Sequence, residues 1–332
     1  MRECSDCVGV NRRDFLKAGA VAGAAVAGGV LLDGPIRAAD EKKKPADGET
    51  LAQQLYGTLT DKQKSAMCFS FEDPLRQKVD NNWRITNAAV STFEPDQQAL
   101  IREIFLSLHS PEYAEKVMQQ VTHDNGKGGF GRCAIAMFGE PGGGKFEFVL
   151  TGRHVTRRCD GDAVEGAAFG GPIFYGHQGQ DAFNEKADHP DNIYWYQALR
   201  ANELFQALDG KQRKIALRSD PRKEAETATV KLSGSAEGLG GIAMGDLSSD
   251  QKTLAKQIMT DVLAPFRKRD VAESMKMIEK QGLDNLHISY FENLDVGNDG
   301  VWDVWQVEGP TMVWYFRGHP HVHTWVHIRD SV

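Results

Sequence analysis

The spacing of hydrophobic residues divides most of the chain into helical and strand-like stretches. Hydrophobic positions three or four residues apart predict helices, and this spacing occurs over residues 50–67, 95–107, 110–122, 195–208, 211–217, 250–263 and 269–281. Short apolar or alternating runs predict strands, and these occupy residues 133–138, 145–150, 151–156, 170–175, 286–291, 301–307, 311–316 and 321–328. Because helices flank two groups of strands, we expect an α+β fold in which antiparallel sheet is flanked by helices.

A short element recurs at three of the predicted helix starts. Its copies are "LTDKQKSA" (59–66), "LDGKQRKIA" (208–216) and "LSSDQKTLA" (247–255). Each copy places a Gln four residues after a Leu, and Thr60, Asp209 and Ser248 are the expected helix N-caps. The recurrence indicates either an internal duplication or one capping solution that is used three times.

The N-terminal residues have the order of features found in an export signal. The twin-arginine signature "NRRDFLK" (11–17) precedes an apolar run over residues 18–32. That run is too short to cross a bilayer core about 30 Å thick as a helix. A small-residue cleavage site follows at Ala38 and Ala39. The segment is therefore interpreted as a signal peptide that is removed after export.

This interpretation gives the domain organisation and the location. Residues 1–39 are the predicted twin-arginine signal peptide, residues 40–49 a solvated linker, and residues 50–332 a single α+β domain. We expect the export machinery to recognise Arg12 and Arg13, and the protein to be periplasmic or secreted without stable membrane insertion. Twin-arginine export usually carries chains that are already folded, which favours a protein that takes up a metal or another cofactor before export.

The chain is mildly acidic, with a net charge of −7, and it contains no basic block. Nucleic acid is therefore not an expected partner. "GEPGGGK" (139–145) fits the G-x-x-x-x-G-K pattern of phosphate-binding loops. Such a loop precedes a helix and continues with Ser or Thr, whereas Phe146 follows here within a predicted strand. We interpret the glycines as a hairpin turn and expect no nucleotide.

The chain has five cysteines, of which Cys4 and Cys7 fall in the signal peptide. The other three are Cys68, Cys133 and Cys159. Cys133 and Cys159 lie in or beside neighbouring predicted strands. They either form a disulfide after export or remain buried free thiols.

The densest group of metal-binding side chains lies near the C-terminus. Four of the ten histidines fall within nine residues, at His319, His321, His323 and His327. Alternate side chains on a strand share a face, so these imidazoles are expected on one side of the sheet. An H-x-H pair can converge on one ion at roughly 2.0–2.1 Å. We therefore predict that His321 and His323 bind a transition metal, copper or zinc, for which imidazole is a suitable ligand.

A third ligand must come from elsewhere in the chain. His154, on another predicted strand, is the best candidate, and His177 is a weaker one. Glu308, beside a predicted C-terminal turn, is the candidate carboxylate ligand or general base. The alternative is that these histidines are structural and bind no metal.

Three arginines, Arg153, Arg157 and Arg158, surround His154 in the sequence. They are interpreted in two ways. They either form an anion-binding wall or lie on the surface and pair with neighbouring acidic residues.

The order of several short motifs resembles that of a bacterial family known as the domain of unknown function 3500, over about residues 50–330. The motifs are Phe138-Gly139-Glu140-Pro141, Gly152-Arg153-His154, Pro172-Ile173-Phe174-Tyr175-Gly176, Glu308-Gly309-Pro310 and His321-Val322-His323. Members of the family carry Gly-His-His at the second motif, so Arg153 is a departure from the pattern. The resemblance implies no established activity, but it favours His154, Glu308, His321 and His323 as one joint site.

Three functions follow as hypotheses. The first is an exported metal-binding protein that acts on an unknown small molecule if it is an enzyme. The second is a non-catalytic binding or scaffold protein with structural histidines. The third is an enzyme with an organic cofactor. If the nitrogens of His154 and His321 lay more than about 10 Å apart, they could not share an ion, and the second hypothesis would be favoured.

Overall fold

The computed structural model of the protein describes residues 47–178, 189–291 and 300–332, which belong to one unit over residues 45–332. Arg12 and Arg13, the arginines of the signal, lie outside the described residues. None of the helices in the described part of the chain is long and apolar enough to span a membrane.

The helices of the described residues are α1 (Gly48–Thr58), α2 (Asp61–Met67), α3 (Pro95–Ser107), α4 (Ala114–Asp124), α5 (Tyr196–Ala207), α6 (Gly210–Ala216), α7 (Ser249–Val262) and α8 (Lys268–Gln281). Four of the helices, α1, α2, α6 and α7, begin at a residue whose side chain caps the helix. The helix predicted over residues 50–67 is in fact two helices, because Leu59 and Thr60 are extended and Thr60 caps a new helix. Asp209 and Ser248 cap α6 and α7 as predicted.

The strands form one mixed sheet that is mostly antiparallel. They are β1 (Cys68–Phe69), β2 (Ala134–Gly139), β3 (Phe146–Gly152), β4 (Val155–Cys159), β5 (Ile173–His177), β6 (Leu217–Arg218), β7 (Ile242–Ala243), β8 (His287–Phe291), β9 (Val304–Gly309), β10 (Met312–Arg317) and β11 (Val322–Ile328). Their order is β1-β2-β3-β4-β5-β11-β10-β9-β8-β6, with β7 also paired to β8. The α+β prediction is therefore confirmed.

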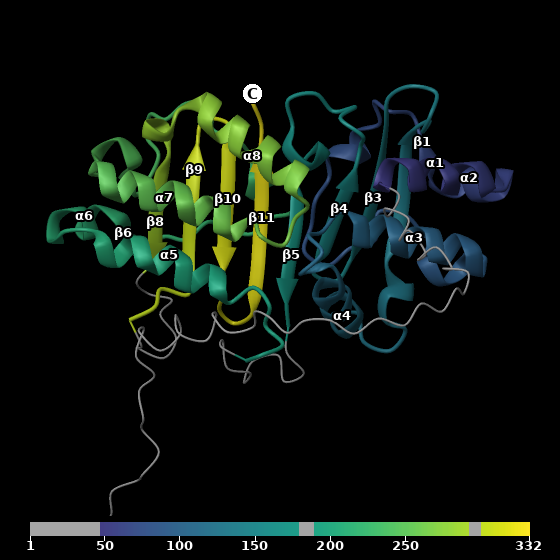
Figure 1. The fold of residues 1–332 in the computed structure, drawn as a ribbon, viewed down its shortest axis with the longest axis horizontal. Helices are drawn as coiled ribbons and strands as arrows, with labels where there is room; N and C mark the ends of the chain where they lie inside the picture. Colours follow the sequence, from purple (N-terminus) through teal and green to yellow (C-terminus); the bar gives the residue numbers. More distant parts are fainter. Residues whose placement is uncertain (1–46, 179–188, 292–299) are drawn as a thin grey trace, which may run out of the picture. The chain divides into compact units, whose positions relative to one another are not determined.

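From either edge to the centre, the sheet has the same series of parallel and antiparallel strand pairs. Each edge strand, β1 or β6, is parallel to its neighbour, and four antiparallel strands then lead to the centre, where β5 and β11 pair. Each half also begins with two helices before its edge strand and has two more before its antiparallel strands. Figure 1 shows the two halves side by side, with β5 and β11 at the junction. This arrangement is the one that an internal duplication would produce.

Glutamine pairs occupy equivalent positions in the two halves. In the first half the side chains of Gln63 (α2) and Gln97 (α3) exchange hydrogen bonds of 2.8 and 3.2 Å. In the second half Gln212 (α6) and Gln251 (α7) do the same at 3.0 and 2.8 Å. All four glutamines also accept a hydrogen bond from the N-cap amide of their own helix. The recurring Gln therefore joins two helix starts in each half.

Helices cover one face of the sheet. In the second half α5, α7 and α8 pack against β5 and β8–β11 around buried Trp305, Trp314 and Phe316, and Figure 1 shows these helices in front of the strands. In the first half α1, α3 and α4 pack against β2–β4. Alternation along β11 sends Val322 and Val326 to this face.

Connecting segments cover the opposite face. Val79, in a connecting segment, and Val230, at the end of a short 3-10 helix (Ala228–Val230), pack there on Phe174 and Trp325. Alternation along β11 places His323 on the same face as Trp325. The His323 side chain on β11 therefore faces these connecting segments and not the helices.

The G-x-x-x-x-G-K sequence lies in the turn of an antiparallel hairpin between β2 and β3. No helix follows its Lys145, so the context that a phosphate-binding loop needs is not present. Cys68, Cys133 and Cys159 are free, and burial raises the pKa of Cys133 to about 12. Cys4 and Cys7 lie outside the described residues.

Candidate metal centre

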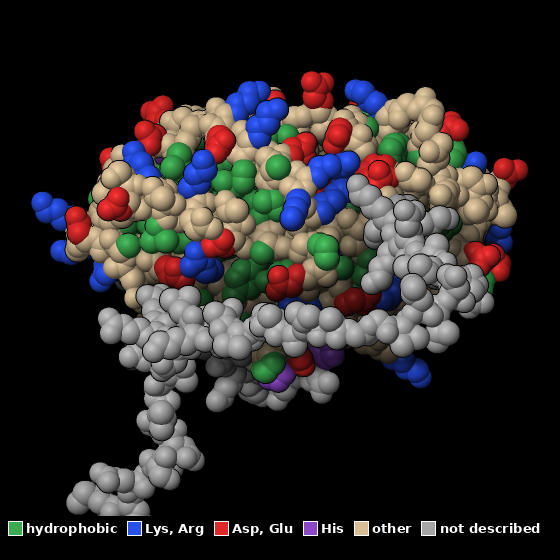
Figure 2. Space-filling model, in the orientation of Figure 1, with side chains coloured by type: hydrophobic (Ala, Val, Ile, Leu, Met, Phe, Trp, Pro, Cys, Tyr) green, Lys and Arg blue, Asp and Glu red, His purple; other side chains and the backbone are tan. Residues whose placement is uncertain are grey.

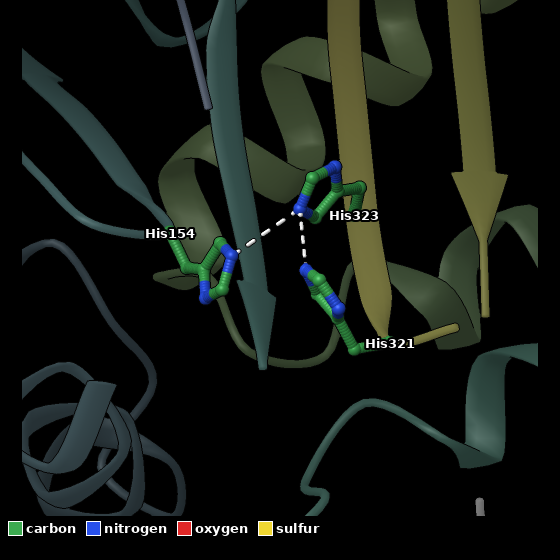
Figure 3. A group of neighbouring side chains, drawn as sticks. All are labelled: His154, His321 and His323. Carbon is green, nitrogen blue, oxygen red and sulfur yellow. Dashed lines mark hydrogen bonds between the residues drawn. The ribbon is translucent and has the colours of Figure 1, made fainter. Parts of the chain in front are cut away.

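Three predicted ligands, His154, His321 and His323, meet at one point. The Nε2 atom of His323 lies 3.2 Å from Nε2 of His154 and 3.0 Å from Nε2 of His321. One ligand nitrogen from each ring lies within 4.8 Å of the others. Figure 3 shows the rings of His154 and His321 pointing toward the same nitrogen of His323. The separation of more than about 10 Å that would favour a scaffold protein is not observed.

His154 lies near His323 although β5 separates β4 from β11 in the sheet. His154 lies in the turn between β3 and β4 with a left-handed φ of 56°, which is uncommon for a residue other than glycine. Its backbone N–H donates to the carbonyl of Asn81 at 2.9 Å. Gly176 on β5 lies between the turn and β11, and a side chain there would collide with the carbonyl oxygen of Val322. The glycine thus keeps the path from His154 to His323 open.

Carboxylates orient two of the three rings. Nδ1 of His154 lies 2.6 Å from Oδ2 of Asp124, and Nδ1 of His323 lies 2.7 Å from Oε2 of Glu224. A carboxylate only accepts hydrogen bonds, so each Nδ1 must carry the proton of its ring. In the neutral rings each Nε2 therefore presents a lone pair, which is the form in which histidine binds a metal.

These tautomers leave one contact that hydrogen bonding does not satisfy. His321 can donate from Nε2 to His323, because its own Nδ1 makes no hydrogen bond to the described residues. The Nε2 atoms of His154 and His323, in contrast, face each other at 3.2 Å with a lone pair on each. Two acceptors at this distance repel each other unless a proton or a metal ion lies between them.

A proton is disfavoured at this place. Burial, opposed by the hydrogen bond to Asp124, lowers the pKa of His154 below its ordinary value. Burial and the positive charge of Arg317 lower the pKa of His323 well below its ordinary value. Burial and the neighbouring imidazoles lower the pKa of His321 to about 3. The three rings are therefore neutral near pH 7, ready to coordinate an ion.

The spacing fits an ion of the transition-metal type. Nitrogen ligands at roughly 2.0–2.1 Å with tetrahedral angles lie about 3.3 Å from one another. Two of the observed separations, 3.0 and 3.2 Å, are close to that value, and the third pair of nitrogens lies within 4.8 Å. These three residues could thus hold a metal ion.

The other candidate residues lie outside this group. Glu308 on β9 pairs with Arg222 at 2.6 Å and accepts a hydrogen bond from Gln306. The register of the sheet places Glu308 level with His327, four residues or roughly 13 Å along the strand direction from His323. The structure therefore does not bring Glu308 to the three histidines.

The remaining histidines of the sequence prediction have other neighbours. Nδ1 of His327 lies 3.1 Å from the carbonyl of Val230. The ring of His177 stacks on His123 with 6.3 Å between centroids. His319 is half-buried and does not belong to the group that could hold an ion.

Taken together, the three arginines near His154 neither form an anion-binding wall nor lie on the surface in pairs with acidic residues. Arg157 and Arg158 are buried: Arg158 pairs with Glu147 at 2.6 Å, and Arg157 donates to Nε2 of His109 at 3.0 Å. Both arginines therefore make their contacts in the interior. Only Arg153 lies near the surface, where it donates to the side chain of Gln178.

No pattern in the sequence pointed to the two orienting carboxylates. Asp124 ends α4, and Glu224 lies in the irregular stretch between β6 and β7. Acidic residues at such places are common and carry no spacing that points to a metal.

In Figure 2 histidine side chains appear at the lower edge of the view, where β5 ends and β11 begins.

Comparisons with known proteins give one match for the N-terminal signal segment and another for the rest of the chain. Residues 9–29 match the signal sequence of the twin-arginine translocation pathway, which indicates export and a periplasmic or secreted protein. No curated protein and no solved structure matches the chain. Residues 42–331 match the family described as "Protein of unknown function (DUF3500)", and the chain belongs to this family.

Proposed function

We propose that this exported protein binds one transition-metal ion, copper or zinc, through His154, His321 and His323. The observation that carries the proposal is the 3.2 Å contact between Nε2 of His154 and Nε2 of His323. Both atoms present lone pairs because their rings donate to carboxylates. His154 and His323 would hold a cation through these two lone pairs, and the repulsion between them would then be removed.

Three protein ligands suit a metal with a function beyond structure. Structural zinc sites are usually closed by four protein ligands, whereas catalytic sites keep one position for water or substrate. A bound metal would supply Lewis acidity to a small molecule in that position. His321 is the least buried of the three ligands, so we place the approach of that molecule on its side.

Metal content tests the proposal. The protein is purified from the compartment to which it is exported, and its metals are measured by elemental analysis. We expect about one copper or zinc ion per chain in the wild type and a loss of at least tenfold in His321→Ala. His319→Ala is the matched control, because it removes an imidazole two residues away that lies outside the group. Metal far below one per chain, or equal metal in all three proteins, would contradict the proposal.

A further inference from the structure

Beside the histidine group lies a second feature, an arginine cleft of about 340 Å³. It is lined by Asn82, Trp83, Arg84, Asp124, Asn125, Gly126, Arg132, Gly152 and Arg153. These residues come from four parts of the chain: the segment between β1 and α3, the end of α4 with the turn after it, the residues just before β2, and the β3–β4 turn. The volume is within the range of sites for small ligands.

The cleft concentrates positive charge that pairs with no carboxylate among the described residues. Arg84 and Arg132 are exposed and Arg153 is half-buried. Within the described residues none of the three takes part in an ion pair. Most other arginines of the described residues pair with carboxylates. Arg132 and Arg153 donate to the neutral oxygens of Asn125 and Gln178, so the three positive charges around this hollow are available to an anion.

The one acidic side chain of the cleft is already engaged. Oδ2 of Asp124 accepts hydrogen bonds from Gln120, from the ring of His154 and from the backbone N–H of Gln178. Its Oδ1 lies 3.3 Å from Nδ1 of His123. Because these groups surround it, Asp124 does not take the place of an anion opposite the arginines.

The other lining groups suit an organic molecule. Trp83 fixes its indole by donating from Nε1 to the hydroxyl of Thr156 at 3.0 Å, and an indole offers apolar surface. The planar guanidinium groups can hold a carboxylate or a phosphate through paired hydrogen bonds. Arg153 is adjacent to His154 in the chain, and its charge contributes to the lowered pKa of His154, His321 and His323. Arg153 thus lies between the cleft and the histidine group.

We propose that the arginine cleft binds the carboxylate or phosphate group of a small organic anion, held by Arg84, Arg132 and Arg153. The cleft itself does not depend on a metal ion in the histidine group. If the proposed metal function holds, the same anion is the molecule presented to the ion, with Arg153 as the positioning residue between the two.

Calorimetric titration with two probes, succinate and inorganic phosphate, tests this site at low ionic strength and separates the two anion types. We expect the wild type to bind at least one probe, and the double variant Arg84→Gln/Arg132→Gln to bind it at least tenfold more weakly. Arg213→Gln, which removes an exposed arginine from α6, is the control and should bind as the wild type does.

The His321→Ala variant separates this proposal from that of the metal. It should lose metal yet keep its affinity for the anion, whereas Arg84→Gln/Arg132→Gln should lose the anion yet keep its metal. Absence of binding by the wild type would overturn the proposal. Equal binding by the double variant, or loss of anion binding in His321→Ala, would also overturn it, because the arginines would then not be the binding groups.

Discussion

At the scale of single residues, the arrangement around His323 decides the chemistry. Its ring is fixed from one side by Glu224 at 2.7 Å, and its other nitrogen faces His154 and His321. Glu224 is in turn paired with Arg317 at 3.1 Å. The Arg317 guanidinium, the Glu224 carboxylate and the His323 imidazole are thus linked in series. This linkage sets the tautomer of His323 and strengthens its imidazole as a metal ligand.

The orienting carboxylate gives the first prediction. Glu224→Gln keeps an acceptor for His323 but removes the negative charge, so we expect copper or zinc affinity to fall roughly 10- to 100-fold. Glu226→Gln, two residues away, removes an exposed carboxylate outside the group and should leave the affinity unchanged. Competition with a chelator of known affinity measures both variants. Equal affinities in Glu224→Gln and the wild type would show that Glu224 does not support the ion.

His327 gives a prediction for the dependence of stability on pH. Burial lowers its pKa to about 4, against the opposing effect of the Val230 carbonyl. The unfolded chain, with an ordinary pKa near 6.5, binds this proton more readily. The free energy of unfolding should therefore fall as the pH falls from 6.5 toward 4, by roughly 3 kcal/mol from this residue alone.

Urea unfolding at pH 7 and pH 4.5 measures this effect. His327→Asn keeps a donor for the Val230 carbonyl but cannot titrate in this range. The wild type should lose about 2–3 kcal/mol more stability than the variant between the two pH values. An equal loss in both proteins would mean that His327 is already protonated in the folded state or titrates normally there.

At the scale of elements, the sequence predicted the types of the elements better than their partners. The alternation of residues 321–328 and the caps at Thr60, Asp209 and Ser248 are local patterns, and the structure contains the strand and the helix starts that they predict. The apolar spacing of residues 50–67 continues across the break at Leu59, so only the Thr60 cap, and not the spacing, indicates the second helix.

The candidate site could be predicted only in part, because local patterns do not show which distant segments come together. His321 and His323 are recognisable because two residues on one strand share a face. His154 joins them through a left-handed turn and across Gly176 on β5, and Asp124 and Glu224 come from segments far apart in the chain. Their proximity depends on the order of the strands, which no local pattern encodes.

The glutamine pairs give a prediction for helix starts. Gln63→Ala removes the acceptor of the Thr60 amide and both bonds to Gln97, so the free energy of unfolding should fall by about 1–2 kcal/mol. Gln212→Ala, at the equivalent place in the second half, should cost about the same. Gln119→Ala, an exposed helix position, is the control and should change stability by less than about 0.5 kcal/mol. Denaturant unfolding measures all three, and pair variants no less stable than the control would contradict this role.

At the scale of the described unit, the two halves share one sheet, and β5 of the first half packs in the hydrophobic core of the second half. The paired strands β5 and β11 belong to different halves. Ile173 and Tyr175 from β5 pack in the same core as Val322 and Val326 from β11 and the helices of the second half. The candidate ion site also lies at this junction, with His154 from the first half and the other two ligands from the second.

This junction predicts cooperative unfolding of residues 45–332. Because neither half can leave the sheet without exposing the core beside β5 and β11, we expect both to unfold in a single transition. Hydrogen exchange of the backbone amides should give the same opening free energy for β3 in the first half and β9 in the second. Two values that differ by several kcal/mol would instead show that the halves unfold as separate units.

The presence of an ion between the three rings can be measured directly by X-ray absorption at the copper and zinc edges, on protein taken from its export compartment. The expected spectrum has three imidazole nitrogens at roughly 2.0–2.1 Å from one ion per chain, and one fewer imidazole nitrogen around any ion that His323→Ala retains. An absence of metal at stoichiometric level, or a coordination shell that His323→Ala leaves unchanged, would contradict a metal centre at His154, His321 and His323.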